Sequence, residues 1–297
     1  MLARSMQYIQ GLRVYHKKLE NVLRQNYQID TKYLEVISWG YQTTAMYIKS
    51  DDDKEYLLKL ANWNDAKEKA IIKDIDLSNM LRNVVSTPVY IKTLSDSYTC
   101  RFEDKILRLS HYISGLAPLE MNFDILEQMI DMLKKIHAFP ASRGEVSAAI
   151  RGSRERRGGD PRRECCRNLR QASGCPTLLH GDLTPHNVLV SFGKIVAVMD
   201  FEISFVGPRE WDLARTAFFS WNYMKNTPFD KVARFVLEKY AEGFINPDLF
   251  YKHAVENAQK HLDAVEKHRD DYDKQKNWEK DHDFALRQLQ GLVLLKS

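Results

Sequence analysis

The residues from His180 to Glu202 constrain the fold of this chain more than any other stretch. Asp182 is followed five positions later by Asn187, and two short apolar runs with a turn at Gly193 then lead to Asp200. Apolar runs around a Gly-containing turn pair as antiparallel strands, which would bring Asn187 and Asp200 together at one end of a hairpin. This layout predicts a phosphoryl-transfer loop. In such a loop Asp182 would accept the proton of the attacking hydroxyl, while Asn187 and Asp200 would hold the Mg²⁺ that bridges the phosphates of ATP.

The first third of the chain has the pattern of a nucleotide-binding sheet. Three runs that we expect to pair as an antiparallel meander lie at residues 34–37, 45–48 and 56–60. Ser38, Gly40 and Thr43 belong to the turn between the first two runs, where backbone N–H groups and small hydroxyls would cover a triphosphate. With its single Gly, this turn falls short of the Gly-x-Gly-x-x-Gly of protein kinases. Lys59 is expected to bind the α and β phosphates, although an ordinary solvent-facing strand Lys has the same local pattern.

Further elements surround this sheet pattern. An amphipathic helix is expected from about residue 6 to residue 26, because apolar residues recur there at three and four positions. A second strand pair is expected at 89–94 and 98–102. Helix 123–137 follows, with one apolar face and Asn122 as its N-cap.

The run His-Gly-Asp-Leu-Thr-Pro-His-Asn around Asp182 resembles the signature of the aminoglycoside phosphotransferase family. That family also contains choline, homoserine and fructosamine kinases and shares the protein-kinase-like fold. A Pro-x-x-x-Asp-Leu-Ala element of the family is matched by the segment with Asp212, and the resemblance implies that His180 and Asp212 support the loop. It also implies an α+β, bilobal fold, with an N-terminal antiparallel sheet lobe for ATP (1–113) and a mostly helical C-terminal lobe (114–297).

Two further parts of the nucleotide site follow from the resemblance. In the family, an acid on the helix after the third strand pairs with the phosphate-binding Lys. Asp74 matches that acid best, although the family usually has Glu there, and Glu68 is the alternative. The run 105–115 resembles the family's strand-to-hinge element, in which backbone groups near His111 and Ile113 would hydrogen-bond adenine.

Residues 141–176 differ in composition from the rest of the chain. They hold nine Arg and no Lys against four acidic residues. Their net charge of 9 − 4 = +5 exceeds the formal net charge of +4 for the whole chain. A basic charge confined to one segment is weak evidence for a nucleic-acid-binding face, so no nucleic acid is expected as a partner. Cys165, Cys166 and Cys175 have no zinc spacing and are expected to be reduced. A disordered insert, an altered reading frame and a functional basic patch all remain open.

The function expected from these residues is ATP- and Mg²⁺-dependent phosphorylation of a hydroxyl on a small molecule. Aminoglycosides, choline, homoserine and sugars are the acceptor types that the resemblance implies. In the family the C-terminal helices build the acceptor pocket, and acids such as Asp263 and Glu266 would suit a cationic acceptor, although a solvated helix face explains them equally well. A catalytically silent nucleotide-binding or interaction protein of the same fold is one alternative. A protein kinase is the other, but the ten positions between Glu202 and Asp212 leave no room for its activation segment.

The sequence shows no sign of a membrane partner. No uncharged apolar run approaches the roughly 18 residues of a membrane span. Residues 1–10 lack the apolar core of a signal peptide. A cytoplasmic protein is therefore expected.

Overall fold

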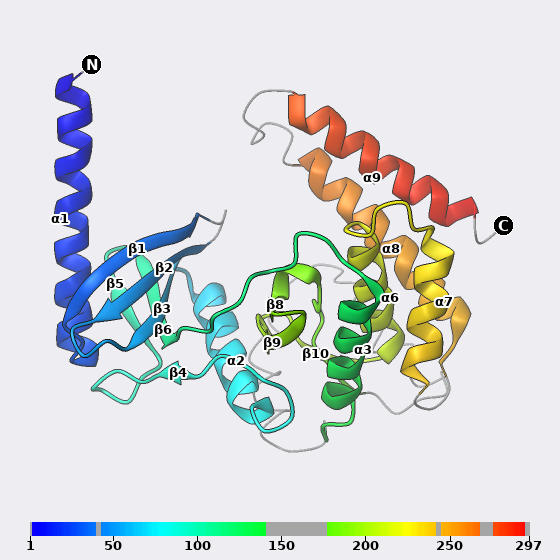
Figure 1. Ribbon diagram of the computed structural model, residues 1–297, viewed down its shortest axis with the longest axis horizontal. Helices are drawn as coiled ribbons and strands as arrows, with labels where there is room; N and C mark the ends of the chain where they lie inside the picture. Colours follow the sequence, from blue (N-terminus) through cyan, green and yellow to red (C-terminus); the bar gives the residue numbers. More distant parts are fainter. Residues whose placement is uncertain (1, 40–42, 141–176, 242–244, 268–275, 295–297) are drawn as a thin grey trace. The chain divides into compact units, whose positions relative to one another are not determined.

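The computed structural model shows an α+β protein and describes most of the chain (Figure 1). The described residues are 2–39, 43–140, 177–241, 245–267 and 276–294. Gly40 and the Arg-rich segment 141–176 lie outside these ranges. The chain divides into two compact units, of which one comprises residues 1–82 and 87–114 and the other residues 83–86 and 115–297.

An antiparallel six-stranded sheet forms the centre of the first unit. Its strands follow the order β1-β2-β3-β6-β4, and β5 also pairs with β6. The strands are β1 (Thr31–Trp39), β2 (Thr43–Ser50), β3 (Glu55–Asn62), β4 (Tyr90–Ile91), β5 (Thr99–Phe102) and β6 (Lys105–His111). The expected meander of the first three strands is confirmed.

The second predicted strand pair is wrong, because its two strands do not pair with each other. β4 covers only Tyr90–Ile91, and both β4 and β5 pair with β6 rather than with each other. The reason is local. The chain turns after β4, where the N–H of Thr93 donates to the carbonyl of Ser97 at 2.7 Å and Asp96 adopts a φ of 64°.

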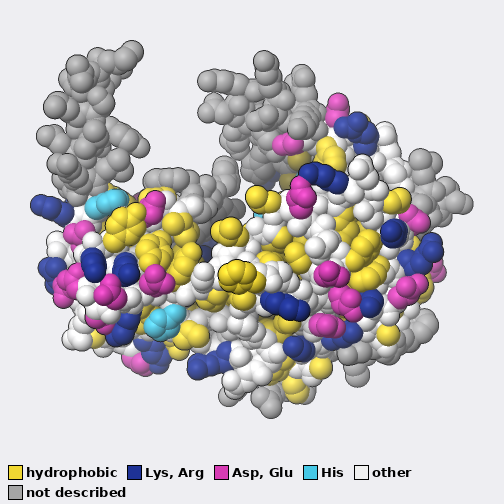
Figure 2. All heavy atoms as spheres, in the orientation of Figure 1, with side chains coloured by type: hydrophobic (Ala, Val, Ile, Leu, Met, Phe, Trp, Pro, Cys, Tyr) yellow, Lys and Arg dark blue, Asp and Glu magenta, His cyan; other side chains and the backbone are white. Residues whose placement is uncertain are grey.

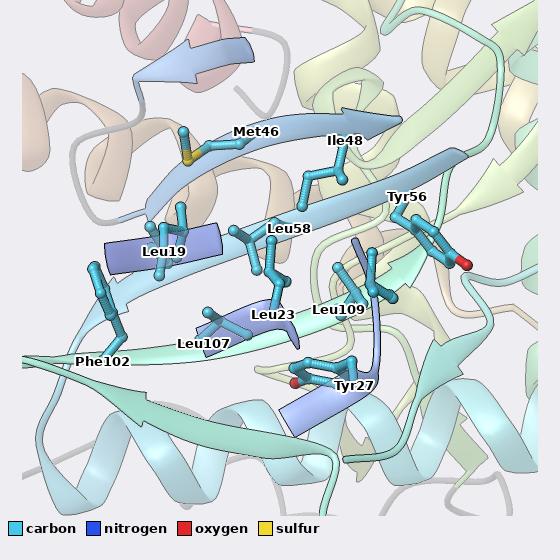
Figure 3. Packing of buried hydrophobic residues seen from close by; sticks show 12 residues of the cluster. Leu19, Leu23, Tyr27, Met46, Ile48, Tyr56, Leu58, Phe102, Leu107 and Leu109 are labelled. Carbon is cyan, nitrogen blue, oxygen red and sulfur yellow. The ribbon is translucent and has the colours of Figure 1, made fainter. Parts of the chain in front are cut away.

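Two helices pack on opposite faces of this sheet. Helix α1 (Leu2–Tyr27) contributes Leu19 and Leu23 to a core that also contains Leu58 and Leu60 of β3 (Figure 3). Ala61 belongs instead to a second cluster with residues of α2 (Asp65–Leu81). Because side chains alternate along a strand, the residues of β3 that face away from α1 include Lys59. Each buried aliphatic side chain of these cores contributes about 1.5–3 kcal/mol to folding.

The second unit is mainly helical. Its helices are α3 (Phe123–His137), α6 (Arg209–Trp221), α7 (Phe229–Tyr240), α8 (Pro247–Lys267) and α9 (Lys276–Leu294). Two small antiparallel sheets accompany them, β7 (Thr177–Leu179) with β10 (Phe205–Gly207), and β8 (Val188–Ser191) with β9 (Lys194–Val198). The predicted helix 123–137 is confirmed, and the Asn122 side chain accepts a hydrogen bond from the N–H of Ile125 at 2.9 Å.

Charged side chains of both signs are mixed on the visible surface of the described residues (Figure 2). Lys and Arg lie among Asp and Glu on that face and do not gather in one basic patch. Of the helices in the described ranges, none combines the length and the apolar character that crossing a membrane requires.

Candidate active site

The loop that carries Asp182 begins where β7 ends and is shaped by Gly181. Gly181 has a φ of +83°, and a Cβ at this position would lie 2.8 Å from the carbonyl oxygen of Ile203. Glycine alone meets both the left-handed backbone and this close approach without strain. After Asp182 the chain enters one turn of 3-10 helix, η1 (Pro185–Asn187), with proline at its first position. Proline suits this position because its missing N–H has no partner in the first turn.

The β8–β9 hairpin places the backbone of Asn187 next to that of Asp200. Val188 pairs with Val198, and the N–H of Met199 donates to the carbonyl oxygen of Asn187 at 2.9 Å. Asp200 is the next residue after this pair, as the hairpin pattern predicted. It adopts a φ of 68°, a left-handed conformation that is uncommon for residues other than Gly, Asn and Asp.

Asn187 also contacts the candidate base. Its Nδ2 donates to the backbone oxygen of Asp182 at 2.9 Å and to the carboxylate Oδ2 of Asp182 at 3.1 Å. Both of these oxygens can only accept, so the amide nitrogen must face Asp182. The amide oxygen of Asn187 therefore points away from Asp182, and it is the atom of this side chain that can serve a cation.

The ring of His180 connects the start of the loop to the segment before Asp200. Its Nδ1 accepts the N–H of Asp182 at 3.2 Å, and its Nε2 donates to the carbonyl oxygen of Met199 at 3.1 Å. A backbone N–H only donates and a carbonyl only accepts, so the imidazole carries its proton on Nε2. The ring also packs on Phe201, with 4.5 Å between centroids. These contacts are what a supporting role for His180 requires.

Asp212 on α6 is buried beneath the same loop. Its carboxylate accepts the N–H of His180 at 2.7 Å and the N–H of Gly181 at 2.8 Å. His137, at the end of α3, contacts the same carboxylate through Nε2 at 3.1 Å and Tyr240 through Nδ1 at 2.8 Å. Hydrogen bonds to an ionised acceptor are stronger than neutral ones. The expected supporting role of Asp212 is consistent with these bonds. His137 was missed because its contact with Asp212 spans 75 positions of sequence.

Arg215 is a second residue that the sequence reasoning missed. Its Nε and Nη2 both lie 2.7 Å from Oδ1 of Asp182. Its Nη1 donates to Oδ1 of Asn257 on α8 at 2.8 Å. A signal was present in the sequence, because Arg215 lies three positions after Asp212 and residues at this spacing share one face of a helix.

In the first unit, Lys59 lies opposite Arg108 in the pairing of β3 with β6. Directly opposed residues share one face of a sheet, and that face also meets α2. Arg108 is buried, and its Nη1 lies 2.8 Å from Oδ2 of Asp74 on α2. The hydroxyl of Tyr90 donates to the same oxygen at 2.7 Å. Asp74 is thus the acid of a buried polar cluster on the sheet face that carries Lys59, and Arg108 was missed by the sequence reasoning.

Glu68, the alternative acid, belongs to a different group of side chains. Its carboxylate oxygen Oε2 accepts from Arg101 of β5 at 2.9 Å and from the indole N–H of Trp63 at 2.9 Å. The guanidinium of Arg101 also stacks on the Trp63 ring, 3.7 Å from its centroid. The geometry therefore favours Asp74 over Glu68 as the acid near Lys59.

The structure describes only part of the predicted phosphate-binding turn, and it describes the predicted hinge. Ser38 pairs with Ala45, so the backbones of Ser38 and Thr43 lie in strands rather than in the turn itself, and Gly40 is outside the described residues. In the hinge, the N–H of His111 donates to the carbonyl of Val89 at 3.0 Å, as part of the sheet edge. The N–H of His111 is therefore engaged within the fold.

Comparison with known proteins identifies the family of this chain. The model of the phosphotransferase enzyme family, APH, matches residues 34–244. No match was found among curated proteins. The range of the family match includes the candidate base, both candidate metal ligands and the residues beneath the loop.

Solved structures with the same fold cover nearly the whole chain. The amicoumacin kinase hAmiN, solved with AMP-PNP, Ca²⁺ and Ami, has a TM-score of 0.64 and 11% identity, with 95% of each chain covered. APH(2")-IIia, solved with GDP and kanamycin, has a TM-score of 0.63 and 14% identity, over 95% of this chain and 99% of that one. Macrolide 2'-phosphotransferase MphH from Brachybacterium faecium has a TM-score of 0.57 and 17% identity, over 89% and 96%.

At these identities the neighbours establish the fold, which is the protein-kinase-like, α+β fold that the sequence predicted. The family model covers well over half of the chain and includes the loop around Asp182. This chain therefore belongs to the phosphotransferase enzyme family.

Proposed function

We propose that this protein transfers the γ-phosphoryl group of ATP to a hydroxyl of a small molecule, with Mg²⁺ as the metal. The observation that carries the proposal is the arrangement around Asp182. Asn187 and Arg215 orient its carboxylate, and Asp212 accepts hydrogen bonds from the backbone of the loop. Phosphoryl transfer depends mainly on positioning and charge stabilisation, and little covalent work is left to the protein. A fixed carboxylate on a rigid loop meets that requirement.

The residues of the hairpin suit Mg²⁺. This hard cation prefers oxygen ligands and keeps few protein side chains, usually one or two carboxylates together with substrate phosphates and water. Asp200 supplies a carboxylate, and Asn187 directs its amide oxygen away from Asp182 because its nitrogen is bonded there. When bound, the cation would neutralise charge on the phosphates. The chain's own contribution is to orient these two oxygens and to keep the amide nitrogen away from the cation.

In this proposal the remaining residues bind and orient the substrates. Asp182 accepts a hydrogen bond from the acceptor hydroxyl and takes its proton as the phosphoryl group is transferred. Lys59 holds the α and β phosphates, with Asp74 as its acidic partner on the same sheet face. The N–H of Ile113 in the hinge would donate to the nucleotide base, because the N–H groups of His111 and Tyr112 are engaged with Val89 and Glu55. Ser38, Gly40 and Thr43 would lie near the phosphates.

The acceptor is proposed only as a hydroxylated small molecule of the aminoglycoside, choline, homoserine or sugar type, and a cationic one remains a hypothesis. Two of the acids that motivate a positive charge have partners within the fold. Asp263 accepts from Gln259 at 2.7 Å, and Glu266 lies 3.4 Å from His282. These contacts engage the two carboxylates within the helical region. The other acids that suit a cationic acceptor, Asp270, Asp271 and Asp273, lie outside the described residues.

The test is a phosphoryl-transfer assay with γ-labelled ATP or GTP, Mg²⁺ and a panel of aminoglycosides, choline, homoserine and sugars. We expect label to move to at least one acceptor with the wild type and to move far more slowly with Asp182→Asn. Nucleotide binding is measured in parallel by calorimetry. Binding of nucleotide without transfer to any acceptor would contradict the proposal and favour the silent nucleotide-binding protein. Absence of nucleotide binding would contradict both.

A further inference from the structure

We propose that Arg215 is a positioning residue that fixes Oδ1 of Asp182 and leaves Oδ2 as the oxygen that accepts the proton of the acceptor. This inference rests on the proposed function, because it assigns roles to the two oxygens of the proposed base. It also connects that base to α8, a helix of the C-terminal part of the chain. The argument starts from the geometry of the guanidinium group.

The guanidinium of Arg215 divides its donors between two elements. Nε donates to Oδ1 of Asp182 at 2.7 Å, Nη2 lies at the same distance from that oxygen as an ion pair, and Nη1 donates to Asn257 at 2.8 Å. A planar fork with donors in fixed directions can make these contacts at once, whereas the single ammonium of a lysine cannot reproduce their geometry. The position of Asp182 is thus tied to that of α8.

Asn257 is itself fixed. It is almost completely buried, and its Nδ2 donates to the carbonyl oxygen of His253, one turn earlier on α8, at 2.8 Å. Since the nitrogen is used for this bond, the amide oxygen must face Arg215. The aromatic ring of Phe219, four residues later on α6, lies under the guanidinium at 4.7 Å from its centroid. Arg215 therefore has a defined position in the folded protein.

The consequence for Asp182 follows from its lone pairs. An ionised carboxylate has about four acceptor sites, two on each oxygen. The Nε–H of Arg215 donates to Oδ1, where Nη2 also lies at 2.7 Å, and Asn187 fills one site of Oδ2 at the longer distance of 3.1 Å. One site on Oδ2 is left for the acceptor hydroxyl. The adjacent positive charge also favours orientation of the hydroxyl over early removal of its proton, as a loose transition state permits.

Kinetics of Arg215→Gln and Arg215→Lys test this role. We expect Arg215→Gln to lower kcat by about 10- to 100-fold, because misplacing a catalytic group by about 1 Å has an effect of this size. The KM for nucleotide should not change. Arg215→Lys should recover part of the loss, since it restores the charge but not the fork. Arg234→Gln on α7 is the matched control, because that side chain is exposed and is bonded only to Asp230 among the described residues; its kinetics should equal those of the wild type.

A double-mutant cycle distinguishes positioning from general damage. If Arg215 acts through Asp182, adding Arg215→Gln to Asp182→Asn should cause little further loss of kcat. A further loss as large as in the wild-type background would overturn the proposal. So would a rise in the nucleotide KM with kcat unchanged.

A spectroscopic measurement keeps the inference testable if no acceptor is found or if Arg215→Gln fails to fold. In ¹H–¹⁵N spectra of arginine side chains, the Nε–H of Arg215 should give a resonance protected from solvent exchange. Arg215→Lys identifies it by its disappearance, and Asp182→Ala, which removes the acceptor oxygen, should remove its protection while Arg234→Gln leaves it intact. A resonance that stays protected in Asp182→Ala, or is never protected, would refute the contact whatever the activity. If only the proposed function were wrong, the protected Nε–H resonance of Arg215 would still be observed.

Discussion

The carboxylate of Asp182 shows how completely a single side chain can be oriented before any substrate binds. Arg215 and Asn187 bond its two oxygens, and the loop around it is held by the buried carboxylate of Asp212. None of these partners is close to Asp182 in the chain except Asn187. The position of the proposed base therefore depends on tertiary contacts, and it can be tested one residue at a time.

Asp182→Asn should lower kcat by about 10²- to 10⁴-fold, the usual contribution of a general base, while the affinity for nucleotide stays close to that of the wild type. The reason is that the residue is assigned to the acceptor and not to the phosphates. Steady-state kinetics with the acceptor found in the panel, together with calorimetry for the nucleotide, measures both quantities. Near-normal turnover in the variant would remove Asp182 from the mechanism.

Asp200→Ala should abolish the dependence of nucleotide affinity on Mg²⁺, and Asn187→Ala should weaken it, because each change removes an oxygen ligand. Asp200→Asn is the matched variant. It keeps a residue type that tolerates the observed φ of 68° but removes the negative charge. Calorimetric titrations with and without Mg²⁺ give the result, and an unchanged metal dependence in the alanine variants would exclude this site.

Helix α6 supports the loop with three residues of one face. Asp212, Arg215 and Thr216 recur at the spacing of neighbouring helix turns, and each bonds the segment 180–183. The hydroxyl of Thr216 donates to the carbonyl of Leu183 at 2.7 Å. One helix thus fixes both the backbone of the loop, through Asp212 and Thr216, and the orientation of the Asp182 carboxylate, through Arg215.

Asp212→Ala should cost about 2–6 kcal/mol of folding free energy. The change leaves the buried N–H groups of His180 and Gly181 without an acceptor, and each unsatisfied group costs about 1–3 kcal/mol. Asp230→Ala, at a partly exposed acid on α7, should change stability by less than about 0.5 kcal/mol. Urea unfolding of the two variants provides the comparison. Equal stabilities would mean that the loop finds other partners.

The packing of α8 on α6 should make stability depend on pH. Burial lowers the pKa of His261 below its usual value of 6.5, and its ring lies against Phe218 and Phe219 of α6. The unfolded chain then binds the proton more readily, so this stability is present above about pH 6.5 and is lost as the pH falls.

We expect the melting temperature to fall less between about pH 7.5 and about pH 5.5 in His261→Gln than in the wild type. Thermal unfolding across this pH range is the measurement. An identical slope in both proteins would show that His261 does not titrate in this window.

The sequence predicted those elements whose signals are local. The hairpin from Val188 to Val198 has an apolar pattern and a glycine turn, and helix 123–137 has both its periodic face and its cap at Asn122. The residues that were missed act over distance in the chain. Arg108 meets Asp74 across 34 positions and His137 meets Asp212 across 75, and no local pattern specifies such pairs. The partners of β4 and β5 were wrong for a different, local reason, the turn that follows β4.

For the molecule as a whole, nucleotide binding should appear as added stability. A ligand that binds only the folded state at 100 times its dissociation constant adds about 2.7 kcal/mol. ATP or GTP should therefore raise the melting temperature when Mg²⁺ is present, and the Lys59→Met variant should show a smaller increase. Thermal-shift measurements with both nucleotides test this, and no shift with either would contradict nucleotide binding.

Residues 83–86 have a consequence for any attempt to divide the protein. They follow α2 in the chain, yet they belong to the unit that contains the β8–β9 hairpin. Ser86 accepts the N–H of Val198 at 2.8 Å and donates its hydroxyl to Val196 at 2.7 Å. A polypeptide that starts at residue 115 would lack the Ser86 hydrogen bonds to β9 and expose the edge of the strand that leads to Asp200. Limited proteolysis or split-protein complementation at the hinge would therefore leave the β8–β9 hairpin dependent on the fragment that carries the sheet.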